Sequence, residues 1–103
     1  MTTDKTGAPT WVSAAVDKFT IAVDGQQVGL TAFVDHDNQR IFHHTEVDDS
    51  YEGRGLATIL VGEALQATRA AGKRIVAVCA LVASYLDKHR DFEQFLRAAV
   101  HTG

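Results

Sequence analysis

Residues 47–65 read VDDSYEGRGLATILVGEAL, and in this stretch two glycines flank an arginine just before a predicted helix. From Leu56 onward, apolar residues recur at the three- and four-residue spacing of an amphipathic helix. Glycine loses much conformational freedom in ordered structure, so its presence on both sides of Arg54 needs a reason. Two reasons are open: a tight turn, or a loop whose backbone approaches an anion such as phosphate at the helix N-terminus.

The chain before this stretch has the periodicity of strands. Residues 18–23, 28–34 and 40–47 are short apolar runs, and the first alternates clearly between apolar and polar positions. The turn-forming clusters DGQQ and DHDNQ separate these runs, and Asp-Gly is a strong hairpin signal. The first half therefore predicts an antiparallel meander.

The chain after the predicted helix returns to strand and then to helix periodicity. Gly72 is placed to end the first helix. Residues 74–80 are apolar on both faces, which predicts a strand buried in the sheet interior. Residues 81–100 have helical spacing, as one helix or as two with the second beginning at Asp91. Together these elements predict an α/β fold.

The composition sets the class of protein. The chain has 103 residues, 46% of them hydrophobic, and a formal net charge of −3, so we expect no nucleic-acid partner. No run is long enough to span a membrane and no secretory signal is visible, so we expect a cytoplasmic protein without a membrane partner. We expect residues 1–10 to be a flexible tail and residues 11–103 to form a single domain. The single cysteine, Cys79, excludes an intrachain disulfide.

The motif HTEVDDSYEGRGLA, followed by the helix, a cysteine at a strand end and VASYLDKH, resembles the GNAT acetyltransferase superfamily and its minimal single-domain group. The superfamily signature is (Gln/Arg)-x-x-Gly-x-(Gly/Ala). Gly55 and Ala57 match its last two fixed positions, and Glu52 stands at the first. The resemblance covers residues 19–95 and implies a minimal GNAT-like fold.

The resemblance also implies ligands and their sites. The acyl donor would be acetyl-CoA, the acceptor an amine with a protein surface as one candidate, and no metal would be needed. Strand 40–47 and the strand after the helix would splay apart, so that the thioester lies between Val47 and Cys79. The backbone of Glu46 and Val47 would bond the pantetheine arm. The loop and the first helical turn would hold the diphosphate through Glu52, Gly53, Arg54, Gly55, Leu56 and Ala57.

Acetyl transfer to an amine needs a base, donors for the oxyanion and a proton for the leaving thiolate. Cys79 precedes a helix whose N-terminus would lower its pKa, so it is either an acyl acceptor or part of the pocket wall. His43 and His44 are candidate bases, which a regular strand would send to opposite faces. Tyr85 is a candidate proton donor.

Three functions remain open at this point. The first is a small N-acetyltransferase that uses acetyl-CoA. The second is a CoA- or acyl-CoA-binding module with little or no catalysis. The third is a protein-interaction domain in which the glycine loop is only a turn. The oligomeric state is open in all three.

Overall fold

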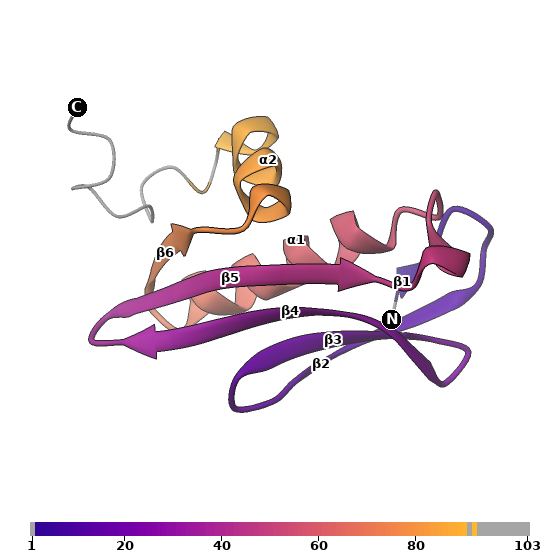
Figure 1. Cartoon of the computed structure of the whole chain (residues 1–103), viewed down its shortest axis with the longest axis horizontal. Helices are drawn as coiled ribbons and strands as arrows, with labels where there is room; N and C mark the ends of the chain where they lie inside the picture. The colour runs from indigo at the N-terminus through magenta and orange to yellow at the C-terminus, as the bar shows by residue number, and fades with distance from the viewer. Residues whose placement is uncertain (1, 91, 93–103) are drawn as a thin grey trace.

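The computed structural model describes residues 2–90 and residue 92 as one mixed sheet with helices packed on it (Figure 1). The strands lie in the sheet in chain order: β1 (Thr2–Thr3), β2 (Pro9–Ala14), β3 (Lys18–Val23), β4 (Gln26–His36), β5 (Gln39–Val47) and β6 (Arg74–Ala77). Neighbouring strands are antiparallel except β5 and β6, which are parallel. Helix α1 (Leu56–Ala70) connects this parallel pair. The predicted α/β fold, a meander followed by one crossover, is confirmed.

The hairpin turns form where the sequence predicts them. Asp24 and Gly25 join β3 to β4 with φ angles of 51° and 84°, the left-handed pair that a two-residue hairpin turn requires. Asp37, with a φ of 54°, begins the turn between β4 and β5. Aspartate tolerates this conformation better than most residues because its short side chain bonds locally. The strands of the meander are therefore set by their turns.

Residues 2–10 are part of the sheet and not the flexible tail predicted for residues 1–10. They contain β1 and the start of β2, and β2 pairs with β3 along its length. The side chain of Asp4 is buried and accepts hydrogen bonds from the amides of Thr6 (2.8 Å) and Ala8 (3.0 Å). It also accepts one from Nε of Arg54 (2.7 Å). This partner is 50 positions away, which is why no local pattern reveals the order of this segment.

The core lies between the sheet and α1. The helix packs against β3, β4, β5 and β6, and α2 (Ala80–Lys88) packs against α1 and against β5 and β6. The fully buried side chains include Ile21, Phe42, Leu56, Leu60, Leu65 and Ile75. Gly72, with a φ of 75°, ends α1 as predicted, because its amide and that of Lys73 bond back to the last helical turn.

The prediction that the strand after the helix lies in the sheet interior is wrong. β6 is at the edge of the sheet and pairs only with β5 among the described residues. Its apolar composition has another cause: α1 and α2 both pack against it, and Ile75 is buried. The predicted final helix begins at Ala80 and ends at Lys88 as α2. Residues 91 and 93–100 of that prediction lie outside the described residues.

Candidate functional site

The loop between β5 and α1 explains its two glycines through backbone conformation. After a short 3-10 helix (Asp49–Tyr51), Gly53 and Gly55 have φ angles of 81° and 78°, where only glycine is unstrained. A tight turn by itself therefore explains both glycines. The same geometry leaves an open helix end, because Gly55 is the N-cap and no side chain of the described residues caps α1. The amides of its first turn are oriented to bind an anion.

A cavity of about 320 Å³ opens at this helix end. It lies where the end of β5, the glycine loop, the first turn of α1 and the start of α2 meet. The structure thus brings together six of the residues predicted to bind the cofactor: Val47, Glu52, Gly53, Gly55, Leu56 and Ala57. Tyr51, Thr58 and Leu81 complete its lining.

Strands β5 and β6 part beside this cavity. Their pairing ends at Phe42 and Ala77, whereas β5 continues to Val47. The carbonyl oxygen of Phe42 accepts the amides of both Val78 (2.9 Å) and Cys79 (3.0 Å), and the chain then turns into α2. Beyond Phe42 the outer edge of β5 therefore has no partner strand among the described residues. This is the splayed geometry that the resemblance implies, with Cys79 on one side and the end of β5 on the other.

Cys79 is half-buried and forms part of a chain of hydroxyl contacts. Its Sγ lies 3.2 Å from Oγ1 of Thr45, which lies 2.8 Å from Oγ1 of the buried Thr31. Burial raises the pKa of the Cys79 thiol, but the Thr45 hydroxyl and the backbone amides of Val82 and Leu81 outweigh it. The net pKa lies below the ordinary 9.0. A larger fraction of the Cys79 side chain is accordingly in the thiolate form than for an ordinary cysteine at the same pH.

Replacing Thr45 with valine should raise the pKa of Cys79, because it removes a donor to the thiolate and keeps the side-chain shape. The rate of alkylation by iodoacetamide against pH gives this pKa directly. In the wild type its midpoint should fall below 9.0, and in Thr45→Val it should move upward. Thr45→Ser keeps the hydroxyl and should leave the midpoint near that of the wild type. A midpoint that does not differ between Thr45→Val and the wild type would contradict this account of the thiol.

The two adjacent histidines are not on opposite faces as a regular strand predicts. Ala32 pairs with His44 and Phe33 pairs with Phe42, so His43 is the extra residue of a β-bulge. Both histidine side chains are exposed as a result. Nε2 of His44 lies 2.9 Å from Oε1 of Glu46, and both side chains of this pair are more than half exposed.

Two predicted site residues, Tyr85 and Arg54, are not among the lining of the cavity at the start of α1. The Tyr85 ring stacks on His89 at 3.8 Å, and its hydroxyl faces Gly62, where an added Cβ would come within 2.7 Å of it. Tyr85 lines a groove of about 190 Å³ between α1 and α2, which adjoins that cavity because Ala57, Thr58 and Leu81 line both. Arg54 turns toward the N-terminal segment and binds Asp4.

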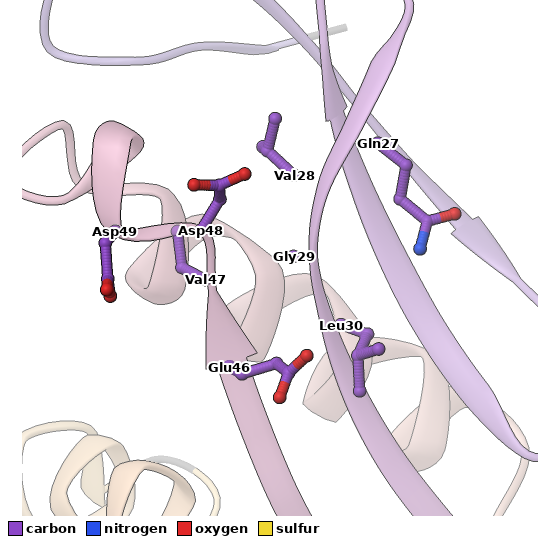
Figure 2. Close-up of a pocket in the computed structure, with 8 residues that line it drawn as sticks. All are labelled: Gln27, Val28, Gly29, Leu30, Glu46, Val47, Asp48 and Asp49. Carbon is purple, nitrogen blue, oxygen red and sulfur yellow. The ribbon is translucent and has the colours of Figure 1, made fainter.

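Glu46 lines a different pocket, of about 440 Å³, at the ends of β4 and β5. Figure 2 shows its carboxylate extending toward Leu30 of the neighbouring strand, with Asp48 close to Val28. Asp49 adds a third carboxylate to this lining. Three carboxylates repel phosphate, so the acidic pocket is not suited to a diphosphate. The uncapped end of α1 is the better anion site.

Two further features concern metals and membranes. Within residues 2–90 and 92, no cluster of three or more histidine, cysteine, aspartate or glutamate side chains has the arrangement of a metal site. No helix of that same part combines the length and the apolar character needed to cross a bilayer.

The comparisons with known proteins agree with this geometry. A family model described as GCN5-related N-acetyl-transferase matches residues 18–95. The chain therefore belongs to the GCN5-related N-acetyltransferase family, which confirms the predicted family and enzyme class. The solution NMR structure of a GCN5-like candidate N-acetyltransferase from Staphylococcus aureus has a similar fold, with a TM-score of 0.65 and 21% identity. The match covers 90% of this chain and 96% of that one. No curated protein matches the chain.

Sequence reasoning missed the residues that complete the site from other elements. Strand alternation from the buried Phe42 predicts that Thr45 is buried only if the bulge at His43 is taken into account. Leu81 lines the cavity because α2 begins directly after Cys79, and the apolar pattern alone assigns it to the core. Tyr51 belongs to a 3-10 turn that no strong pattern marks.

Proposed function

We propose that this protein binds acetyl-CoA and transfers its acetyl group to an amine. The observation that supports this proposal is that an uncapped helix end and an unpaired strand edge lie at the same cavity. The uncapped N-terminus of α1 borders the same cavity as the end of β5, and β5 has already parted from β6 at that point. A diphosphate at the helix end would leave the pantetheine arm next to an unpaired strand edge, to which it can add backbone hydrogen bonds.

In this proposal each predicted binding residue has a defined part. The first-turn amides of α1 and those of the glycine loop hold the diphosphate, and the helix dipole favours its charge. The backbone of Glu46 and Val47 binds the pantetheine arm. The thioester then lies between the end of β5 and Cys79, in the splayed region. Arg54 is not a direct phosphate ligand in this arrangement because its guanidinium binds Asp4.

The chemistry is direct transfer. The neutral amine nitrogen attacks the thioester carbon, the C–S bond breaks, and the CoA thiolate leaves and takes up a proton. We propose His44, hydrogen-bonded to Glu46, as the group that accepts the proton of the amine. His43 is the second candidate for this base, and Tyr85 is the candidate donor of the proton that the CoA thiolate takes up. Cys79, half-buried and in contact with the Thr45 hydroxyl, then forms part of the pocket wall beside the carbonyl. As acceptor we propose an amine on a protein surface, and as location the cytoplasm.

Thermal unfolding with CoA tests binding. A ligand at about 100 times its dissociation constant adds about 2.7 kcal/mol of stability, which is a clear shift for a domain of this size. Acetyl-CoA with a panel of amines, including lysine-bearing peptides, then tests transfer through release of free CoA thiol. Stabilisation without turnover would favour a CoA-binding module. No stabilisation by CoA or acetyl-CoA would contradict the proposed function.

Intact-mass analysis distinguishes direct transfer from an acyl-cysteine route. After incubation with acetyl-CoA and no amine, the wild type should show no stoichiometric acetyl adduct, and Cys79→Ala should keep most of the transferase activity. An adduct that is lost in Cys79→Ala, and that passes to an added amine at a competent rate, would overturn direct transfer.

A further inference from the structure

Lys5 lies over the loop at the start of α1. Its amide donates to the carbonyl oxygen of Arg54 at 3.0 Å. A Cβ added to Gly55 would meet Cε of Lys5 at 3.2 Å and its Cγ at 3.3 Å, so the alkyl chain crosses this glycine. Because Nζ is bonded to Cε, the ammonium group also lies close to Gly55, the N-cap residue of α1.

Lys5 lines a second cavity next to the one at the helix end. Arg54 and Thr3 also line this second cavity, which has a volume of about 440 Å³. Gly55 and Thr58 line both this cavity and the one at the end of β5. A ligand whose phosphates occupy the helix end therefore has room to continue into the second cavity beside Lys5.

The guanidinium of Arg54 interacts with side chains of the protein itself. It binds the buried carboxylate of Asp4 at 2.7 Å, contacts Oγ1 of Thr6 at 3.2 Å and lies 4.9 Å from the ring centre of Tyr51. The hydroxyl of Thr6, the amides of Ala8 and Thr6, and Arg54 hold the pKa of Asp4 at about 2, despite its burial. Asp4 is ionised at neutral pH and neutralises Arg54. The ion pair fixes the segment that carries Lys5.

The loop itself is acidic, with Asp48, Asp49 and Glu52 close in sequence to the helix end. A diphosphate there needs a cation to offset these charges. No described carboxylate pairs with Lys5, so its charge is available.

We propose that residues 3–7, fixed by the Asp4–Arg54 ion pair, form part of the CoA site, and that Lys5 contacts the phosphates of the nucleotide half of CoA. This inference rests on the proposed function. These residues lie outside the region 18–95 that matches the family model, so the family match does not account for the contact.

Calorimetric titration with CoA tests the assignment in the wild type, Lys5→Ala, Lys5→Arg and the control Lys18→Ala. Lys18 is a partly exposed lysine on β3 that lines neither cavity. Lys5→Ala should weaken CoA binding about tenfold, the effect of losing one charge-assisted hydrogen bond. Lys5→Arg should keep most of the affinity, and Lys18→Ala should match the wild type. The loss should shrink at high salt. If Lys5→Ala also weakens the binding of 3′-dephospho-CoA, Lys5 contacts the diphosphate. If it does not, Lys5 contacts the 3′-phosphate of CoA. Both results support the proposal.

A double mutant tests the role given to Arg54. If Arg54 acts by holding the segment, Arg54→Ala weakens binding in the wild type but adds little in the Lys5→Ala background. Full additivity would overturn that role and assign Arg54 to direct phosphate contact. Equal CoA affinity of Lys5→Ala and the wild type would overturn the assignment of Lys5 and leave the proposed function intact. A wild type that does not bind CoA would overturn both.

Discussion

Replacing Ala57 with glutamate should abolish CoA binding without weakening the fold. Ala57 is half-buried, lies in the first turn of α1 and lines the cavity at the helix end. A glutamate there fills the cavity and places a carboxylate where the diphosphate should bind. Carboxylates at helix N-termini are themselves favourable, by about 0.3–1 kcal/mol. We therefore expect at least about 100-fold weaker binding, or about 2.7 kcal/mol, with an unchanged or higher Tm.

Two control variants separate the causes of this loss. Ala57→Gln has almost the same volume without the charge, so it should lose less affinity than Ala57→Glu. Gln66→Glu adds the same charge on an exposed position of the same helix and should leave CoA binding close to that of the wild type. Calorimetry gives the affinities and thermal unfolding gives the stabilities. If a folded Ala57→Glu variant bound CoA with wild-type affinity, the helix end would not be the phosphate site.

Replacing Phe42 with alanine should cause a large loss of stability. The Phe42 side chain is fully buried and its ring lies 5.8 Å from that of Phe33. Removing a buried aromatic side chain costs about 3–5 kcal/mol, through lost burial and the cavity left behind. Phe42 is also the last residue of β5 that pairs with β6, and its carbonyl anchors the turn that leads to Cys79. We therefore expect acetyl-CoA binding to weaken together with the fold.

Urea unfolding followed by circular dichroism measures this loss. Val34→Ala is the matched control, because Val34 belongs to the same hairpin but is 54% exposed. An exposed site of this kind usually changes stability by less than about 0.5 kcal/mol. A loss below about 1 kcal/mol in Phe42→Ala would contradict the packing described for this part of the sheet.

Local periodicity predicts most of the fold because each of its elements carries its own signal. The alternation in 18–23, the Asp-Gly turn and the helical spacing after Leu56 all correspond to observed elements. The edge position of β6 does not follow from its composition, because helices that pack on a strand make it as apolar as neighbouring strands do. The order of residues 2–10 depends on the contact between Asp4 and Arg54, which has no local signal in the sequence.

The candidate site is predictable to a similar degree. The glycine loop and the first turn of α1 are contiguous in sequence, so one motif locates most of the cavity lining. The histidines are not predictable in the same way, because the bulge at His43 changes the side-chain alternation that the prediction assumes. Arg54 is adjacent to the proposed phosphate site in sequence, but the buried carboxylate of Asp4 directs its side chain elsewhere.

The most direct test of the central claim is an amide-detected NMR titration of the isotope-labelled protein with CoA. Hydrogen bonds to phosphate shift the resonances of backbone amides strongly, and backbone amides form the proposed phosphate site. We expect the largest shifts at the amides of Gly53, Gly55 and Ala57, with smaller ones at Glu46 and Val47. An unchanged spectrum at millimolar CoA, or shifts confined to the acidic pocket around Asp48 and Leu30, would contradict the account.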